Sequence, residues 1–123
     1  MQEFKSAIGL APVDPQSCSV RAGVFVKDEM IYCAYKGARD LLFFTTRRIL
    51  LIDKQGITGK KQEYLSIPIS RIQAFSYETA GTIDLDSEIK IFISVLGALK
   101  IRIIRPTSNM DPAITALNMM LLS

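Results

Sequence analysis

The polar and apolar positions along most of this chain follow the short periods of β-strands. Two unbroken apolar runs, residues 41–44 and 49–52, are separated by a basic pair, Arg47 and Arg48. Short runs of this kind, rich in aliphatic and aromatic residues and bounded by turn signals, favour strands over helices. Residues 39–69 therefore predict two or three antiparallel strands together with their turns.

Alternation continues through the second half of the chain. In residues 85–95 the side chains are expected on two opposite faces, with Ile89, Ile91, Ile93 and Val95 on one and Glu88, Lys90 and Ser94 on the other. Pro68 has no N–H to donate, so we expect it at a strand end or a sheet edge. In total the pattern predicts seven strands, at residues 30–35, 40–46, 47–54, 62–67, 72–79, 85–95 and 99–104.

The first 28 residues fit this pattern poorly. Three apolar side chains at helical spacing predict a short helix over residues 2–10: Phe4, Ala7 and Ile8. Pro12 and Pro15 then require a turn, and an extended connection follows. Residues 24–29 fit a helical turn and a short strand equally well. We therefore expect residues 1–28 to form an N-terminal helical and extended segment.

The chain stops being β-like at Pro106. Asp111 and Pro112 form a good helix start, with Asp as the N-cap and Pro at the first helical position. The apolar residues beyond them recur at the spacing of one buried stripe: Ala113, Ile114, Leu117 and Leu121. The predicted fold is mainly β with a C-terminal α-helix. It is a seven-stranded antiparallel bent β-barrel or sandwich (residues 29–105) capped by one helix (residues 107–122).

The composition places these elements in one domain, residues 1–123. A chain of this length buries roughly two-thirds of its unfolded surface, which is enough for a core without disulfides or metals. Apolar residues make up 49% of the chain and the mean hydropathy is +0.24, which indicates either a β-rich core or a surface buried against another subunit. No run is long enough to span a bilayer and no signal peptide is recognisable. The sequence therefore predicts a cytoplasmic protein with reduced thiols at Cys18 and Cys33.

The residue types argue against catalysis and metal binding. The chain has no histidine, so the usual general base is missing, and two cysteines cannot form a four-ligand zinc site. The glycine-containing segment 56–61 lacks the spacing of a phosphate-binding loop. Acids alternate over residues 84–88 as in a calcium loop, yet Ile89 stands where that loop needs glycine. We expect no enzyme activity, no cofactor and no metal.

Several segments resemble the bacterial pleckstrin-homology-like (PH-like) family, and they occur in the family's order. They are RDLLFFTTRRILLIDKQGITGKK, SIPISRI, ETAG and DLDSEIKIFIS, and together they cover about half of the chain. The resemblance implies a bent barrel closed by the C-terminal helix, with no established enzymatic activity and a role in protein binding. It also implies a cyclic homo-oligomer, a pentameric ring, in which neighbouring barrels share a polar surface.

The chain departs from the PH domains that bind inositol phospholipids. Those domains use a cluster of basic residues between their first two strands, where residues 35–40 offer only Lys36 and Arg39 beside an acid, Asp40. Recognition of two or three phosphate groups needs more positive charge than this. The tryptophan usual in the C-terminal helix of eukaryotic members is also missing. Specific phosphoinositide binding is therefore not expected.

The charged residues are distributed unevenly, although the net charge is only +3. Bases dominate residues 36–61 and acids dominate residues 78–88. In a head-to-tail ring two different patches of each subunit meet, so opposite charges would complement each other and fix the register. The candidate interaction residues are Arg39, Arg47, Arg48, Lys60, Lys61, Glu78, Asp84, Asp86 and Glu88. The alternative is that these charges are solvated strand ends and turns.

The predicted function is a non-enzymatic binding or scaffold module that assembles with itself and binds an unidentified protein partner. As an alternative, residues 36–61 would attach a peripheral module weakly to an anionic membrane, with avidity from the ring. Nucleic acid is a less favoured partner, because Phe43, Phe44 and Tyr64 lie in apolar runs that suit a core better than base stacking.

Overall fold

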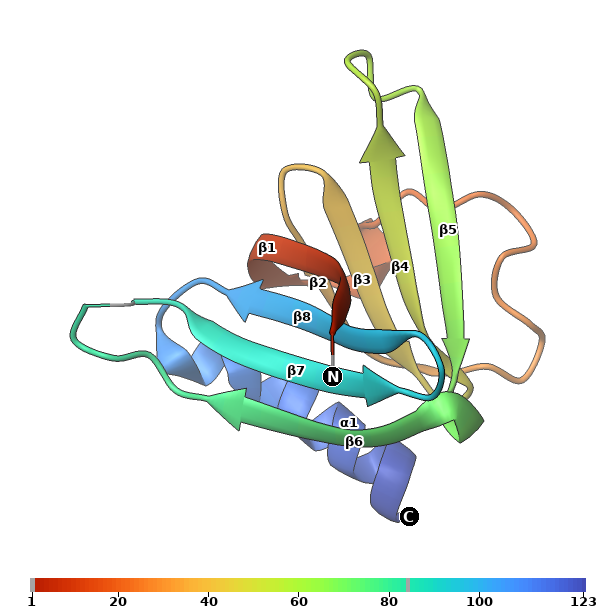
Figure 1. Ribbon diagram of the computed structural model, residues 1–123. Helices are drawn as coiled ribbons and strands as arrows, with labels where there is room; N and C mark the ends of the chain where they lie inside the picture. Colours follow the sequence, from red (N-terminus) through yellow and green to blue (C-terminus); the bar gives the residue numbers. More distant parts are fainter. Residues whose placement is uncertain (1, 84) are drawn as a thin grey trace.

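The computed structural model describes residues 2–83 and 85–123, and its strands form one open sheet followed by a helix (Figure 1). The strands are β1 (Glu3–Val13), β2 (Ile31–Lys36), β3 (Asp40–Thr45), β4 (Arg48–Gln55), β5 (Lys61–Pro68), β6 (Ile72–Glu78), β7 (Ser87–Ile93) and β8 (Gly97–Ile103), and the helix is α1 (Asp111–Leu122). Short 3-10 turns occupy Pro15–Ser17, Ile69–Arg71 and Thr107–Met110. The mainly β fold with one C-terminal helix is confirmed. The sheet differs from the expectation in having eight strands instead of seven and in not closing into a barrel.

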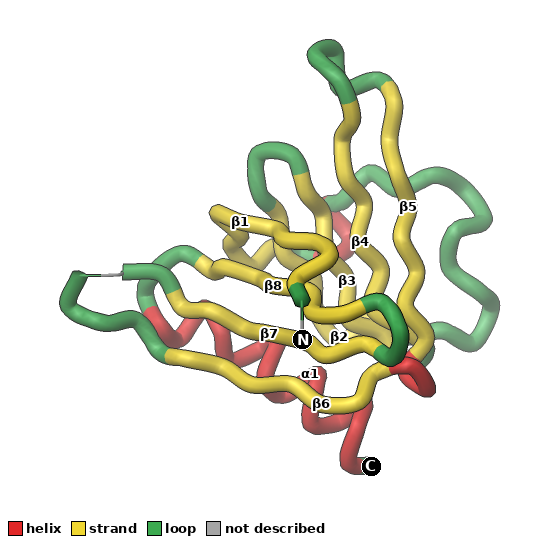
Figure 2. The backbone as a smooth tube through the Cα atoms, viewed as in Figure 1, coloured by secondary structure: helices red, strands yellow, loops and turns green. Residues whose placement is uncertain are grey.

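The sheet bends into two arms that run at a steep angle to each other (Figures 1 and 2). Its strand order is β5-β4-β3-β2-β1-β8-β7-β6. We call β2 to β5 the four-strand arm and β6 to β8 the three-strand arm. β1 joins them, because its C-terminal part pairs antiparallel with β2 and its N-terminal part pairs parallel with β8. β5 and β6 consequently lie at the two edges of the sheet.

The expected N-terminal helix is wrong, because Glu3–Val13 form β1. Its buried side chains, Ala7 and Leu10, are three positions apart. Gly9 adopts a positive φ of 67°, and the register with β8 shifts between Ala7 and Leu10. This bulge replaces the two-residue period of a strand with a spacing that imitates a helix. Residues 24–29, left open between helix and strand, contain neither.

The strand expected over residues 85–95 is shorter than predicted. β7 ends at Ile93, and the isoleucines at 89, 91 and 93 are buried as predicted. Val95 is not in the strand: it lies in the turn to β8 with a positive φ of 74° and is 98% exposed. The turn carries no proline, asparagine or glycine before Gly97, so the alternating pattern continues past the end of the strand.

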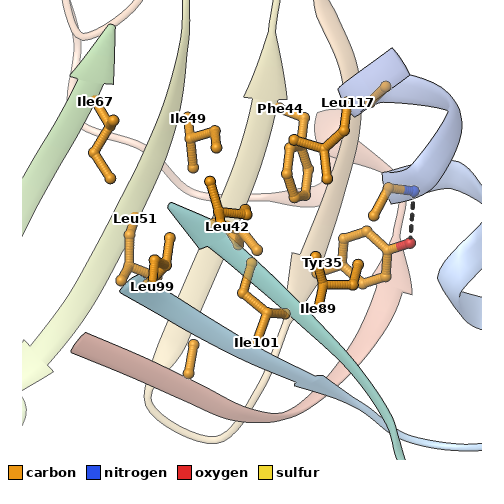
Figure 3. Close-up of a cluster of buried hydrophobic side chains, with 14 of the residues drawn as sticks. Tyr35, Leu42, Phe44, Ile49, Leu51, Ile67, Ile89, Leu99, Ile101 and Leu117 are labelled. Atoms are coloured by element: carbon orange, nitrogen blue, oxygen red, sulfur yellow. Dashed lines mark hydrogen bonds between the residues drawn. The ribbon is translucent and has the colours of Figure 1, made fainter. Parts of the chain in front are cut away.

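The main core lies between the two arms and α1 (Figure 3). Buried side chains from both arms meet there, among them Leu42, Leu51, Leu99 and Ile101. Complete burial of one such side chain stabilises the fold by roughly 1.5–3 kcal/mol relative to an exposed one. This shared core holds the arms at a fixed angle and therefore fixes where their ends lie.

α1 covers the main core with one face. The predicted stripe is confirmed, since two of its members are fully buried and two are partly buried against the core: Ala113 and Leu117, then Ile114 and Leu121. Ala116 and Met120 complete the buried face. Within residues 2–83 and 85–123, no helix has the length and apolar character needed to cross a membrane.

Tyr35 ties the beginning of α1 to β2. Its hydroxyl donates to the Asn109 carbonyl oxygen at 2.7 Å and accepts from the Ala113 N–H at 3.0 Å. Burial raises the pKa of this hydroxyl above its ordinary value, so it stays protonated. Asp111, the predicted N-cap, is instead the first helical residue, and Met110 precedes it without a side-chain cap. The tyrosine thus satisfies a backbone donor that a capping side chain usually satisfies.

A second, smaller core lies on the other face of the four-strand arm. Its fully covered residues are Ala34, Phe43, Leu50 and Ile52, and side chains of the connection 14–30 pack on them. Phe25 of that connection meets Phe43 edge to face, with ring centroids 5.2 Å apart. Because β3 and β4 are buried on both faces, they read as unbroken apolar runs.

The chain passes over the turn between β7 and β8 at close range just before β1 begins. The Ala98 N–H donates to the Gln2 carbonyl oxygen at 2.9 Å. A Cβ atom at Gly97 would lie 2.2 Å from that same oxygen, and Gly97 also has a positive φ of 118°. Only glycine combines this backbone conformation with such a close approach.

Candidate interaction surface

The basic candidate residues do not form one surface. The hairpins reverse the chain, so Arg39, Lys60 and Lys61 lie at one end of the four-strand arm, and Arg47 and Arg48 lie at the other. The eight residues of β4 separate the two groups by roughly 25 Å. The basic stretch is therefore continuous in sequence but divided in space.

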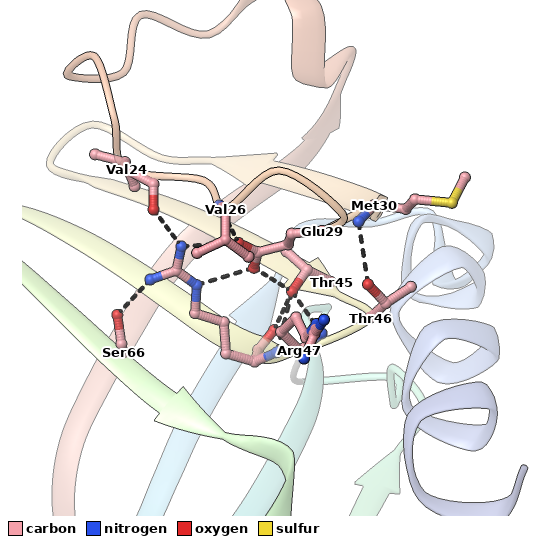
Figure 4. A network of polar contacts seen from close by, with 9 residues as sticks. Val24, Val26, Glu29, Met30, Thr45, Thr46, Arg47 and Ser66 are labelled. Carbon is pink, nitrogen blue, oxygen red and sulfur yellow. Dashed lines mark hydrogen bonds and ion pairs between the residues drawn. The ribbon is translucent and has the colours of Figure 1, made fainter.

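Arg48 makes most of the contacts of a polar network whose partners Val24, Glu29 and Ser66 are labelled in Figure 4. Its guanidinium donates to both carboxylate oxygens of Glu29, at 2.9 Å each, and to Ser66 Oγ at 2.8 Å. Thr45 Oγ1 donates to the same carboxylate at 2.6 Å. The Glu29 side chain is 0% exposed, and the network fixes the connection 14–30 to β4. Arg48 is therefore part of the fold and is not available to a partner.

Glu29 stays ionised in this buried position. Burial alone would raise its pKa, but hydrogen bonds from Arg48, Thr45 Oγ1 and the Val26 N–H together outweigh burial and hold the pKa below its ordinary value. A buried ion pair recovers the cost of desolvation only when its hydrogen bonds are complete. This pair meets that condition, so the loss of either partner would leave a buried charge without compensation.

Arg39 and Arg47 also make contacts within the chain, at more exposed positions. Arg39 Nη2 donates to the carbonyl oxygens of Lys54 at 3.0 Å and Gly56 at 2.8 Å, which fixes the hairpin between β4 and β5. Arg47 pairs with Asp28, and both side chains are more than half exposed. An exposed pair contributes about 1 kcal/mol or less, so Arg47 can exchange this partner for another.

A basic cleft lies where the β2–β3 and β4–β5 hairpins meet the connection 14–30. Two adjoining pockets form it, the first of about 170 Å³, and Ser19 and Gln62 line both. The bases around the cleft are Arg21, Lys36, Arg39, Lys54 and Lys60. Lys36 and Lys54 belong to the predicted basic region 36–61 but were not among the individually named candidates, and Arg21 lies outside that region. The signal that points to Lys36 and Lys54 is their place at the same end of paired strands, whereas nothing in the sequence brings Arg21 to this site.

A row of carboxylates crosses the same end of the four-strand arm. Asp40 on β3 lies opposite Asp53 on β4, which lies opposite Glu63 on β5. Lys5 Nζ reaches the row from β1, 3.1 Å from Asp53 Oδ2 and 2.9 Å from Glu63 Oε1. Burial and the neighbouring Asp53 charge raise the pKa of Asp40 to about 6. This row offsets part of the positive charge around the cleft.

The acidic candidates lie at the far end of the three-strand arm. Glu78 ends β6 and is exposed, and it lies opposite Glu88 on β7. Three cations surround the Glu88 carboxylate at 3.6–3.8 Å: Lys90, Lys100 and Arg102. Asp86 lies in the loop between the strands, and Asp84 lies outside the described residues. The charge of Glu88 is thus largely balanced within the chain, while Glu78 faces solvent.

The two cysteines are unbridged thiols. Burial raises the pKa of the Cys33 thiol to about 12, which makes it a poor nucleophile near neutral pH. In the part of the chain that the structure describes, no three Cys, Asp or Glu side chains are arranged to hold a metal ion. The surface offers a basic cleft, an acidic end and two exposed sheet edges, which are features suited to binding.

Comparison with known proteins agrees with this architecture. The sequence matches the family model described as "Bacterial PH domain" over residues 5–122. A solved DUF1696 family protein with a pleckstrin-homology domain, from Shewanella loihica PV-4, is 33% identical with a TM-score of 0.79, over 94% of this chain and 100% of that one. A solved pleckstrin homology domain from Shewanella amazonensis SB2B is 40% identical with a TM-score of 0.65, over 81% of each chain.

A curated relative adds a closer match over a shorter segment. "Uncharacterized protein YjqA" of Bacillus subtilis (strain 168) is 55% identical over 73 residues, which cover 59% of this chain and 58% of the relative's length. The family model spans nearly the whole chain, and the solved structures share its PH-like fold. The resemblance of the strand segments is thereby confirmed, and this chain belongs to the bacterial PH domain family.

Proposed function

We propose that this chain is a non-enzymatic protein-binding module that works as a cyclic assembly of its own copies. Family membership supports the non-enzymatic part, because PH domains are generally non-catalytic. The observation that carries the self-assembly is the exposed edge of β6. Its composition and surroundings differ from those of the other edge strand, β5.

β6 is an edge strand without the usual protection against pairing. Edge strands commonly carry lysine, proline or inward charges that keep their unpaired backbone groups from joining another sheet. β5, at the other edge, begins with Lys61 and ends with Pro68. β6 reads IQAFSYE, with no base and no proline and with its one charge at the last position, Glu78. Its backbone is therefore suited to contact with a second chain.

Large apolar side chains are exposed beside this edge. Phe75 and Tyr77 stack with ring centroids 6.4 Å apart, and Tyr77 is 49% exposed. In the loop that follows, Ile83 is 95% exposed and Leu85 is 41% exposed. Exposed apolar side chains gathered on a small domain mark a protein contact. A subunit interface here would account for part of the high apolar content of the sequence.

In the proposed assembly two different surfaces of each copy meet head to tail, and the contacts close into a ring. The ring presents several identical surfaces to an unidentified protein partner, and this multiplicity raises the apparent affinity. The exposed polar residues of the arm ends, such as Lys61, are then available to that partner.

The mass of the purified chain, measured by light scattering, tests this proposal. The wild type is expected as a discrete oligomer well above the 13.7 kDa of one chain. Ala74→Lys places a charge at an exposed position of β6 and is expected to give a folded monomer. Thr115→Lys, on the exposed face of α1, is the matched control and should leave the mass unchanged. A wild-type monomer at high micromolar concentration would refute the proposal.

A second candidate function is attachment to an anionic membrane through the basic cleft. The observation that favours it is the convergence of five bases from separate segments around two adjoining pockets. Each surface base near anionic lipid contributes about 1 kcal/mol, so several together give measurable binding at low salt.

Sedimentation with vesicles tests the second candidate. Phosphatidylcholine vesicles with added phosphatidylserine should carry the protein into the pellet, and high salt should release it. The variant Lys54→Gln with Lys60→Gln should bind less, whereas Lys27→Gln with Arg105→Gln, which removes the same charge elsewhere, should bind like the wild type. Equal losses in both variants would exclude a specific role of the cleft.

A further inference from the structure

The hairpin between β4 and β5 projects from one end of the four-strand arm. Its last paired residues are Gln55 and Lys61, so its tip consists of residues 56–60. Figures 1 and 2 show this tip at the top of the view, farther out than the neighbouring β2–β3 hairpin. We call residues 56–60 the hairpin tip. A flat surface that approaches this end of the arm would meet the hairpin tip first.

The hairpin tip presents an apolar side chain. Ile57 is fully exposed. Gly56 and Gly59 flank it with positive φ angles of 70° and 68°, a conformation that lets the chain reverse on either side of Ile57 and Thr58. A single exposed apolar side chain is ordinary on a small domain. The shape and charge of its surroundings therefore decide what Ile57 can contact.

The chain holds the hairpin tip in one conformation. Arg39 Nη2 donates to the carbonyl oxygens of Lys54 and Gly56 and thereby fixes the start of the turn. At its end, the Lys60 N–H donates to Thr58 Oγ1 at 3.4 Å. A preformed turn loses little conformational entropy in a contact, so little of the gain from burying Ile57 is spent on ordering the loop.

Positive charge surrounds Ile57. The segment 54–62 has no acid, and its three lysines are all exposed: Lys54, Lys60 and Lys61. Lys54 lines the basic cleft, on one face of the hairpin. Lys61 lies opposite Gln55, one position along the strand pair, so it points to the other face. The lysines thus lie on both sides of the apolar side chain.

The acids nearest to this segment are held within the chain. Lys5 Nζ lies within 3.1 Å of both carboxylates, those of Asp53 and Glu63. The ion pairs offset these negative charges at the base of the hairpin. The charge that remains toward the tip is therefore positive.

An apolar side chain between lysines at a projecting tip fits the surface of an anionic bilayer. The lysines stay at the level of the headgroups, where each is attracted to anionic lipid. The apolar side chain enters the boundary between headgroups and acyl chains. A stable protein interface instead needs an extended complementary surface, which a narrow tip with one apolar side chain does not offer.

We propose that the hairpin tip inserts Ile57 into the boundary between headgroups and acyl chains of an anionic membrane, while Lys54, Lys60 and Lys61 contact the headgroups. The inference rests on the second candidate function and adds to it the element that enters the membrane. The basic cleft by itself attracts the bilayer only through charge. The inserted isoleucine adds an apolar contact, which can be removed without changing any charge.

Substitution of Ile57 measures this apolar contact. Ile57→Ser keeps every charge, and it should unfold at the wild-type Tm because the side chain it replaces is fully exposed. In sedimentation with phosphatidylcholine vesicles that contain phosphatidylserine, its affinity is expected to be about tenfold lower than that of the wild type. Leu122→Ser, at a position 78% exposed at the end of α1, is the matched control and should bind like the wild type. Equal affinities of Ile57→Ser and the wild type would overturn the inference.

A single tryptophan locates the hairpin tip directly. The chain contains no tryptophan, so Ile57→Trp carries the only indole. On the same vesicles its emission is expected to shift to shorter wavelength, and lipids brominated on their acyl chains are expected to quench it. Leu122→Trp should keep the emission of an exposed indole. An unshifted emission from Ile57→Trp that is bound to vesicles would overturn the insertion and leave the second candidate function in place.

Two further outcomes separate the possible failures. A wild type that stays in the supernatant with these vesicles at low salt would overturn both the inference and the second candidate function. If Ile57→Ser binds vesicles like the wild type but has a lower mass in light scattering, the hairpin tip contacts another copy of the chain. That result would also overturn the insertion.

Discussion

The two arms of the sheet differ in how they are covered. In the four-strand arm, β3 and β4 lie between the main core and the second core under the connection 14–30. In the three-strand arm one face packs on the main core, and the other is polar and partly exposed, so β7 alternates between buried and less buried positions. Burial on both faces allows an unbroken apolar run, and burial on one face requires alternation.

This difference gives the charged residues two different roles. In the four-strand arm one of them, Arg48, attaches the covering connection through its ion pair with Glu29. In the three-strand arm none of the described connections covers the outer face, and Glu78 at the end of β6 remains exposed. A cluster of charges in the sequence therefore does not predict a binding surface until it is known which strand faces are covered by other parts of the chain.

Among the variants that test this difference, the largest loss of stability is expected from Arg48→Met, which breaks the contact between β4 and the connection 14–30. Glu29 is then left as a buried carboxylate without its partner, and such a loss costs about 3–5 kcal/mol. We expect the free energy of unfolding, measured by urea denaturation, to fall by this amount. Amide exchange should accelerate first in the connection 14–30.

The neighbouring arginine supplies the control. Arg47→Met removes an exposed pair with Asp28 and should cost about 1 kcal/mol or less. Arg48→Met combined with Glu29→Leu removes both buried charges and should recover much of the loss. Equal costs for the two arginines would contradict the division between attaching and available charges.

A smaller loss is expected from Gly97→Ala in the three-strand arm. The new Cβ would lie 2.2 Å from the Gln2 carbonyl oxygen and would separate the start of β1 from β8, at a cost of about 2–3 kcal/mol in unfolding free energy. Gly56→Ala is the matched control, because Gly56 has a φ of 70° but open space around its Cβ position. Its cost should stay near 1 kcal/mol. Similar values for both variants would exclude the close approach as the cause.

A still smaller effect is expected from Tyr35→Phe, which loosens α1 from the four-strand arm. The Ala113 N–H and the Asn109 carbonyl oxygen lose their partner, at a cost of about 1–2 kcal/mol. Thermal unfolding should detect the change, and Tyr32→Phe, at a position 38% exposed, should have almost none. An unchanged Tm for Tyr35→Phe would show that the hydroxyl does not support the helix start.

The smallest change is expected from Asp40→Asn, and it depends on pH. Asp40 ionises near 3.8 in the unfolded chain, whereas in the fold burial and then Asp53 raise its pKa to about 6. Between these values the folded state binds more protons, so this carboxyl lowers stability as the pH rises from about 4 to about 6. The Asp40→Asn variant should lack this fall of stability with rising pH. At pH 7 it should unfold at a higher temperature than the wild type. Parallel pH profiles of the two proteins would contradict this account.

The sequence predicts those parts of the fold in which each face of a strand or helix is either buried or exposed along the whole element. The runs in β3 and β4, the alternation in β7 and the stripe in α1 each follow from burial on a fixed set of faces. β1 does not, because the bulge at Gly9 changes the spacing of Ala7 and Leu10 to one that a helix shares. The turn at Val95 is not predicted by the sequence either, since valine favours extended backbone and here adopts a positive φ.

The candidate surface is less predictable than the fold, because it depends on which strand ends meet. Arg48 is one residue from Arg47, yet one side chain is buried in a network and the other is exposed. The basic cleft combines Arg21 with residues of two hairpins. Arg21 lies beside them because the connection 14–30 passes over this end of the four-strand arm. The pocket between the end of β5 and the turn from β7 to β8 likewise joins segments that lie far apart in the sequence, so no local pattern marks it.

The pairing of β1 with β8 has a consequence for the order of folding. Lys5 lies beside Leu99, so the first strand finds this neighbour only when nearly the whole sheet has been synthesised. β2 to β5 follow one another through short hairpins and can pair as they leave the ribosome. Contacts between distant residues form late because the intervening chain must first be closed into a loop. The topology thus sets a sequence of events in which local hairpins form early and the two arms are joined last.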